Sequence, residues 1–170
     1  MSRPAPAEER PSKSSAPPRA LVLGVGNLLR GDDGFGVHLI ASLADTPLPE
    51  DVRILEAGTV SHELIPLLSE LEHLIVIDAV EANDRPGAVF LFSPDDIPFA
   101  CERLVSLHQI GLIDVLRLAG LTGRSPRTVI IGVQPKDVSS WSLALSDEVR
   151  EAMPKVRELV LGELKKANLL

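Results

Sequence analysis

The chain has 170 residues and a net charge of −7, with 17 basic and 24 acidic side chains. This acidic balance argues against binding to nucleic acid or to an anionic membrane surface, because both attract basic proteins. No apolar run approaches the ~20 residues of a membrane span. A single cysteine excludes an internal disulfide framework and a cysteine-based zinc cluster. The chain is 45% hydrophobic but only 3% aromatic, so we expect a single domain around an aliphatic core.

The N-terminal segment differs in composition from the rest of the chain. It is rich in Pro, Ser, Ala and charged residues and cannot bury enough apolar surface to become ordered. We therefore predict a disordered tail over residues 1–18 and one α/β domain over residues 19–170. The tail has no apolar core segment and does not resemble a secretory signal, so we expect a cytoplasmic protein.

The stretch LVLGVGNLLRGDDGFGVHLIA at residues 21–41 predicts a buried strand, a glycine turn, an acidic pair and a helix. The two glycines of GVG allow a sharp turn, because glycine adopts positive φ without steric cost. Asp32 and Asp33 then follow where the helix should begin. An acid at this place can cap a helix, but one cap needs only one acid. We interpret Asp32 as the cap and Asp33 as the functional residue.

The rest of the chain alternates between strand and helix patterns. Strands are predicted at residues 52–56, 73–79, 88–92 and 128–133, and helices at residues 62–71 (capped by Ser61), 110–119 and from Ser146 onward, with Pro154 kinking or ending the last one. Near-continuous apolar runs such as HLIVIDA are typical of parallel strands covered on both faces. The alternation indicates an α/β sheet with helices on both faces.

A candidate site falls at one edge of this sheet, because ligands bind beyond the carboxyl ends of parallel strands. The acidic pair, Asp78 at the end of its strand and a loop bearing His108 all belong to that edge. Two carboxylates and an imidazole suit a divalent metal ion. Each residue alone also has a structural interpretation, as a cap or a core histidine, and it is their convergence that favours a site. We interpret His38 and His73 as structural.

Competing motifs match less well. The GVG turn suggests a dinucleotide-binding loop, but Leu29 stands where the third glycine belongs and the acidic pair would repel a pyrophosphate. The segment HELIP has Pro66 in place of the second histidine of H-E-x-x-H. Cys101 and His108 leave a thiol dyad open, although a lone cysteine in a loop is more often an inert filler.

The segment GVGNLLRGDDGFG at residues 24–36 resembles the opening motif of the [NiFe] hydrogenase maturation proteases. The resemblance covers nearly all of residues 19–164. Its further segments are EAGT at 56–59, LIVIDA at 74–79, SLHQIGL at 106–112 and GVQP at 132–135. Members of this family are endopeptidases that trim the C-terminal extension from the large subunit of [NiFe] hydrogenases after nickel insertion.

The resemblance implies a three-layer α/β/α fold with a mixed, mostly parallel five-stranded sheet. We assign the antiparallel strand to residues 88–92, because the short loop before it cannot hold a crossover helix. The family's metal-contacting residues, which we also expect to be catalytic, correspond to Asp33, Asp78 and His108. Asp32 or Asp33 remains an alternative as the base.

Three such ligands are poorly suited to holding a resident metal and well suited to completing the coordination of an ion that arrives on a substrate. The resemblance therefore implies an endopeptidase that acts on a [NiFe] hydrogenase large-subunit precursor and recognises the substrate-borne nickel. We expect no resident cofactor, no nucleic acid or membrane partner, and a monomer. The alternative is a non-catalytic nickel- or nucleotide-binding accessory module on the same fold.

Overall fold

The computed structural model describes four segments of the chain, residues 17–58, 62–96, 107–122 and 125–170. At residues 62, 107–110 and 122 it describes the backbone alone. The predicted tail over residues 1–18 falls almost wholly outside the described part and stays a prediction. Ser61 and Cys101 also lie outside it.

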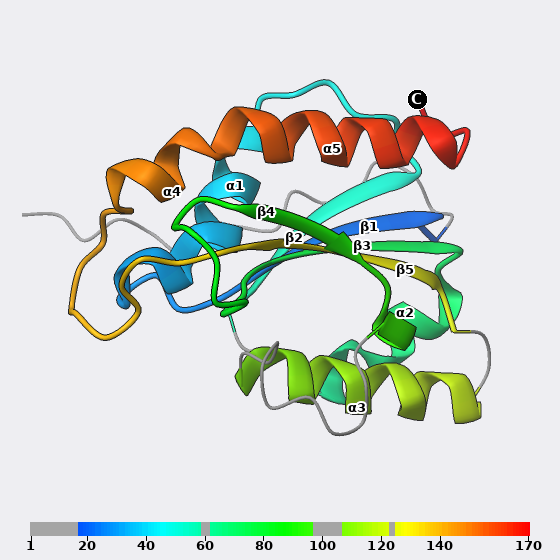
Figure 1. Cartoon of the computed structure of the whole chain (residues 1–170). Coiled ribbons are helices and arrows are strands. Elements are labelled where there is room, and N and C mark those ends of the chain that lie inside the picture. The colour runs from blue at the N-terminus through cyan, green and yellow to red at the C-terminus, as the bar shows by residue number, and fades with distance from the viewer. Residues whose placement is uncertain (1–16, 59–61, 97–106, 123–124) are drawn as a thin grey trace, which may run out of the picture.

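The described residues form one mixed sheet, and its strands coincide with apolar runs of the sequence. Its five members are β1 (Ala20–Val25), β2 (Val52–Gly58), β3 (His73–Ala79), β4 (Val89–Phe92) and β5 (Arg127–Val133). They lie in the order β2-β1-β3-β5-β4, and every neighbouring pair is parallel except β4 with β5. The mostly parallel five-stranded sheet and the antiparallel strand near residues 88–92 are therefore confirmed (Figure 1).

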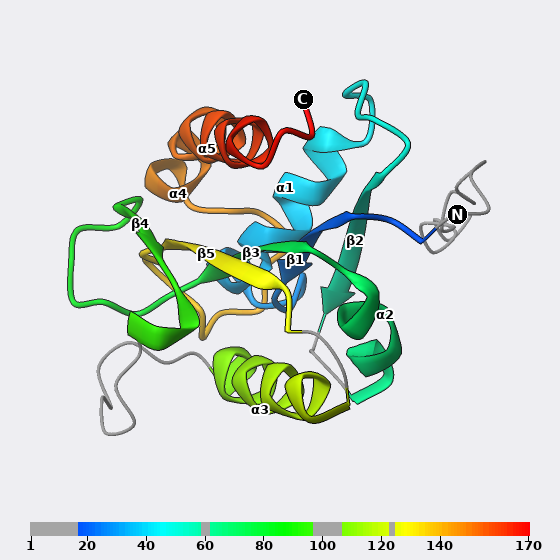
Figure 2. The same ribbon diagram turned by 90° about the vertical axis from the view of Figure 1, so that its right-hand side faces the viewer.

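Helices cover both faces of the sheet, which gives the expected three layers (Figure 2). One face carries α1 (Phe35–Leu43), α4 (Asp147–Glu151) and α5 (Met153–Lys166), and the other carries α2 (Ile65–Glu70) and α3 (Leu107–Thr122). Short 3-10 turns are η1 (Gly31–Gly34), η2 (His62–Leu64) and η3 (Pro94–Asp96). Pro154 stands at the start of α5, so it ends the first helical segment and begins the next, as the sequence predicts. Among the described residues, no helix is long and apolar enough to span a membrane.

Strand alternation divides the core between the two faces. Successive side chains of a strand point to opposite faces, and in β1 the fully buried Val22 and Leu23 belong to different clusters. The first cluster joins Val22 to α1 and α5 through residues such as Leu39 and Val160. The second joins Leu23 to α2 and α3 through residues such as Leu68. The core is thus two aliphatic layers separated by the sheet, which explains how so few aromatic residues suffice.

Two glycines bring α1 unusually close to the sheet. A Cβ added to Gly24 in β1 would collide with the carbonyl oxygen of Gly36 in α1. A Cβ added to Gly36 would collide with the carbonyl oxygens of Val25 and Ile77, near the ends of β1 and β3. The first turn of α1 can therefore lie directly on two strand ends only because both residues lack a side chain. The chain that precedes α1 is held at the same edge of the sheet.

This close approach predicts a large effect of Gly36→Ala. The new methyl group must displace backbone rather than a flexible side chain, so we expect a loss of about 3 kcal/mol in the free energy of unfolding. Gly162→Ala in α5 is the matched control, because nothing lies within 4 Å of its added Cβ. That control should gain about 0.5–1 kcal/mol from helix propensity. Urea denaturation of both variants checks this prediction, and equal stabilities would contradict it.

Candidate functional site

Asp33 lies in the turn that joins β1 to α1. Gly26 has a φ of 135°, and a Cβ there would collide with the carbonyl oxygen of Asp33, so the turn can close only with glycine at this place. The Asp33 carboxylate is half-buried and accepts a hydrogen bond at Oδ2 from the Asn27 amide, at 3.1 Å. The Asp33 amide in turn donates to the carbonyl oxygen of Arg30, at 3.2 Å. The turn η1 therefore holds Asp33 at the carboxyl end of β1, in contact with β3.

Asp78 occupies the penultimate position of β3 and is only 1% exposed. Ile77 pairs with Gly24, so Asp78 lies level with the end of β1 in the neighbouring strand. By strand alternation, Asp78 belongs to the same face as Val76, which packs in the cluster of α2 and α3. A buried carboxylate thus lies at the strand edge predicted from the sequence, on the face that α3 covers.

His108 belongs to a helix and not to the predicted loop. We expected the helix to begin at Ile110, but α3 begins at Leu107, so His108 lies in its first turn. The segment SLHQ does contain a start signal, because Ser106 followed three residues later by Gln109 fits the capping-box pattern, and the sequence prediction did not use it. The C-terminal end of α3 leads into β5, so the turn with His108 lies toward the opposite, carboxyl edge of the sheet (Figure 1).

Asp33 in η1 and Asp78 near the end of β3 lie at the same edge of the sheet. The first turn of α3, which contains His108, lies toward that edge. The side chain of His108 is outside the described part, so the complete trio stays a prediction. Among the described side chains, no group of three or more His, Cys, Asp or Glu residues has an arrangement that could hold a metal ion. His108 is not among these described side chains.

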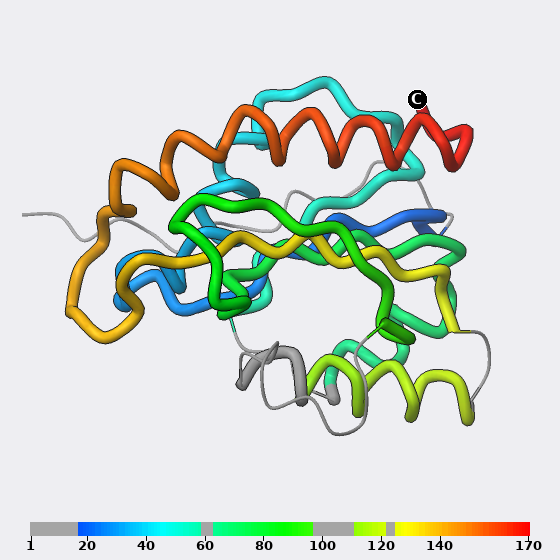
Figure 3. Tube along the Cα trace, in the orientation of Figure 1, coloured from blue at the N-terminus to red at the C-terminus, as the bar shows by residue number. Residues whose placement is uncertain are grey.

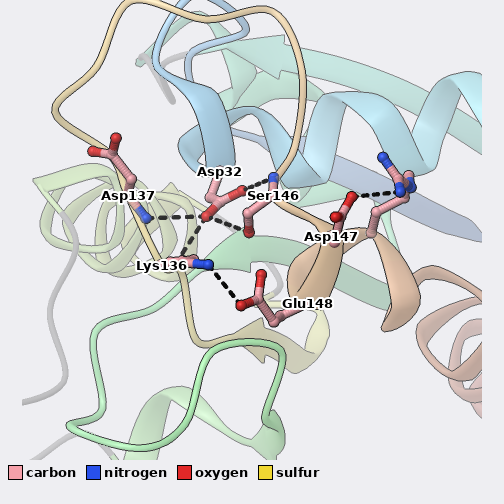
Figure 4. A network of polar contacts seen from close by, with 7 residues as sticks. Asp32, Lys136, Asp137, Ser146, Asp147 and Glu148 are labelled. Carbon is pink, nitrogen blue, oxygen red and sulfur yellow. Dashed lines mark hydrogen bonds and ion pairs between the residues drawn. The ribbon is translucent and has the colours of Figure 1, made fainter.

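Asp32 has a different role from the helix cap that we predicted. Neither η1 nor α1 receives a side-chain cap, and the Asp32 carboxylate instead accepts four hydrogen bonds from described residues (Figure 4). Oδ2 accepts from the Lys136 amide at 2.8 Å, the Asp137 amide at 3.0 Å and the Ser146 hydroxyl at 2.9 Å. Oδ1 accepts from the Ser146 amide at 2.7 Å. Asp32 therefore joins both ends of the loop at residues 136–146 to η1.

The predicted position of Ser146 at the start of the last helical segment is confirmed, but its side chain does not form the cap. Ser146 stands at the N-cap position of α4 by its backbone, but its side chain makes no cap hydrogen bond. Its hydroxyl donates to Asp32 instead. A sequence pattern detects caps within a few residues, whereas these two residues meet across more than 100 positions.

Further contacts fasten the 136–146 loop along the glycine turn. The Gly31 amide donates to the carbonyl oxygen of Ser142 at 2.9 Å, and the Ser142 amide donates to that of Leu29 at 3.1 Å. His38 of α1 makes a 3.0 Å hydrogen bond through Nε2 with the carbonyl oxygen of Leu143, which supports its structural interpretation. The loop that follows β5 is thus attached to the loop that follows β1. Figure 3 shows the two segments side by side at the same end of the molecule.

An exposed aromatic contact lies on the outside of this junction. The guanidinium carbon of Arg30 lies 4.8 Å from the ring centroid of Trp141, a cation–π geometry, and Nη1 of Arg30 donates to the carbonyl oxygen of Ser139 at 3.1 Å. Trp141 is 75% exposed and is the single tryptophan of the chain. Arg30 therefore orders the outer part of the loop while Asp32 holds its two ends.

Polar contacts in and beside the 136–146 loop favour the charged forms of three side chains, those of Lys136, Asp137 and Glu148. Hydrogen bonds from Ser140 and Ser139 hold the pKa of the Asp137 carboxyl well below its usual range. Lys136 and Glu148 form a 2.6 Å ion pair, and this contact raises the pKa of Lys136 and lowers that of Glu148. All three groups are exposed, so these contacts contribute little to stability and mainly set the local conformation.

Gln134 is a further residue whose role the sequence did not reveal. Its side chain is buried, and Oε1 accepts hydrogen bonds from the amides of Ala82 at 2.8 Å and Asp84 at 3.3 Å. Its Nε2 donates to Glu81 at 2.8 Å. Gln134 thus shapes the loop that leaves β3 shortly after Asp78. A polar residue directly after a buried strand was the available signal, but its partners lie about 50 positions away.

Comparison with known proteins agrees with this fold. The protein-family model described as hydrogenase maturation protease matches residues 37–163. The solved structure of the hydrogenase maturating endopeptidase HybD from Escherichia coli superimposes with a TM-score of 0.80 and 34% sequence identity, over 88% of this chain and 93% of that chain. The chain therefore belongs to the hydrogenase maturation protease family, with the three-layer fold of its solved members.

Individual relatives show how far the similarity extends. The hydrogenase expression/formation protein HupD of Rhodobacter capsulatus is 43% identical over 136 residues, which cover 78% of this chain and 65% of that protein. The hydrogenase 2 maturation protease of Escherichia coli is 33% identical over 154 residues, which cover 89% of this chain and 93% of that protein. The chain thus spans about two thirds of the HupD relative and nearly all of the second.

The four hydrogen bonds to Asp32 predict that Asp32→Ala is costly. The substitution leaves three loop amides and a hydroxyl without their charged acceptor, so we expect a loss of about 3 kcal/mol in the free energy of unfolding, rather than the ~1 kcal/mol of a lost cap. Asp147→Ala is the matched control, since its side chain is 80% exposed and forms a surface ion pair with Arg150. Chemical denaturation should show a change within about 0.5 kcal/mol for that control. A similar small change in both variants would refute the tethering role.

Proposed function

We propose that this protein is the endopeptidase that removes the C-terminal extension of a [NiFe] hydrogenase large-subunit precursor after nickel insertion. The observation that carries the proposal is the packing of η1, with Asp33, against β3, which ends at Asp78 and Ala79. Two carboxylates, one from η1 and one from the end of β3, thus lie at the carboxyl edge of parallel strands, where ligands of such sheets bind. Membership of the maturation protease family supports the reaction class.

The position of α3 supports the inclusion of His108. Asp78 belongs to the sheet face that α3 covers, and the first turn of α3 lies toward the carboxyl edge. The trio would therefore draw on three elements, η1, the end of β3 and the first turn of α3. Carboxylate and imidazole ligands suit nickel alongside thiolates supplied by a substrate.

The proposed mechanism treats nickel as part of the substrate. Three protein ligands leave coordination positions open, so Asp33, Asp78 and His108 would complete the coordination of an ion already held by the precursor. A precursor without the ion would lose these contacts and bind less well, which makes recognition depend on metal insertion. Asp33, whose side chain is only half-buried, also remains the candidate base for the attacking water.

The alternative function is a non-catalytic nickel- or nucleotide-binding accessory module on the same fold. The family match does not favour it, and the glycine turn is occupied by the backbone of Asp33 rather than left open for a pyrophosphate. Incubation with a nickel-loaded large-subunit precursor separates the two functions. A protease shortens the precursor, whereas an accessory module leaves its length unchanged.

The trio predicts three inactive variants. Asp33→Ala, Asp78→Ala and His108→Ala should each reduce processing of the nickel-loaded precursor by at least ~100-fold, because each removes a group from the reacting centre. Asp147→Ala, which changes an exposed side chain of α4 outside the trio, should process at the wild-type rate. Gel analysis of the precursor over time measures all four. Wild-type activity in any of the three would remove that residue from the site.

Thiol chemistry gives an independent prediction. We expect Cys101→Ala to process the precursor at the wild-type rate, and we expect the wild-type protein to be insensitive to iodoacetamide, because the proposed reaction uses no thiol of this chain. Mass spectrometry should verify that Cys101 has been alkylated. Loss of turnover with an unchanged melting temperature would instead support the Cys101/His108 dyad.

A further inference from the structure

We propose that Asp32 is a positioning residue, whose buried carboxylate uses the 136–146 loop to hold Asp33 in place before the substrate arrives. This inference rests on the proposed function and deepens it. Asp32 is 1% exposed and belongs to the same 3-10 turn as Asp33. Its carboxylate points into the loop that follows β5 (Figure 4).

Both ends of the loop converge on the one carboxylate. The amides of Lys136 and Asp137 reach it from the start of the loop, and the amide and hydroxyl of Ser146 reach it from the end. Four donors at 2.7–3.0 Å compensate a charge that would otherwise be costly to bury. A single side chain thus joins two loop ends that are ten positions apart in the sequence.

The backbone of η1 is fastened to the same loop. The Asp32 amide donates to the carbonyl oxygen of Asp137 at 3.1 Å, and the Gly31 amide donates to that of Ser142 at 2.9 Å. The Asp33 amide then donates within the turn to Arg30. A displacement of the loop therefore reaches the backbone of Asp33 through contacts on the two residues before it. Because small displacements of a reacting group greatly reduce a rate, the loop is expected to affect the chemical step.

The isosteric variant Asp32→Asn tests this role without opening a cavity. An amide offers one acceptor oxygen where the carboxylate offers two, so its NH₂ group must face at least one backbone amide donor. We expect kcat for the nickel-loaded precursor to fall about tenfold while KM stays within about twofold. Ser146→Ala removes only the hydroxyl donor and should give a smaller decrease in kcat. Asp147→Asn is the matched control and should leave both constants unchanged.

A second measurement does not depend on turnover. Amide hydrogen exchange at Asp33 should accelerate in Asp32→Asn and, to a lesser degree, in Ser146→Ala, whereas exchange in β1 and β3 should be unchanged. If Asp32→Asn does not fold, Ser146→Ala carries both measurements. An inactive wild-type protein would contradict the proposed function and leave the exchange comparison to decide the inference.

Three results would overturn the positioning role. The first is unchanged exchange at Asp33 in both variants. The second is a higher KM with an unchanged kcat, since this would make the loop a substrate-binding element. The third is a lower melting temperature with both kinetic constants unchanged, because Asp32 would then be purely structural.

Discussion

The close approach of α1 to the ends of β1 and β3 is the constraint on which the site depends. Gly24 and Gly36 permit this approach, because a side chain at either position would meet backbone carbonyl groups. The turn between β1 and α1 consequently packs against the carboxyl edge of the sheet. Asp33 therefore lies at the edge where β3 ends, just after Asp78. Gly24 and Gly26, which suggested a dinucleotide-binding loop, thus serve packing. Gly24 admits the first turn of α1, and Gly26 admits the backbone of Asp33.

The 136–146 loop, more than 100 positions later in the sequence, imposes a second constraint on the same turn. Asp32 and Asp33 are neighbours, yet their side chains have separate surroundings. The first is buried among donors of the 136–146 loop, and the second is half-exposed at the strand edge. This division explains why the acidic pair exceeds the needs of a helix cap. One carboxylate is held by the loop, and the other lies at the strand edge where we propose the reacting centre.

Most of the fold was predictable because its signals are local. The bounds of β3 agree with the prediction to the residue, since an unbroken apolar run ends at turn residues, and the glycine turn and α1 also lie where predicted. The start of α3 and the partners of Asp32 were not predicted. The start of α3 was set too late because the capping-box pattern of SLHQ at residues 106–109 was not used, whereas the partners of Asp32 lie more than 100 positions away. Long-range polar contacts leave no periodic pattern in a sequence, so only the folded structure reveals them.

The central claim is that the protein recognises nickel already inserted in its substrate. The most direct test compares cleavage of one large-subunit precursor in nickel-loaded and metal-free forms, at equal concentration and under single-turnover conditions. The account predicts that the loaded form is shortened and that the metal-free form remains intact until nickel is inserted. Equal cleavage rates for the two forms would contradict it.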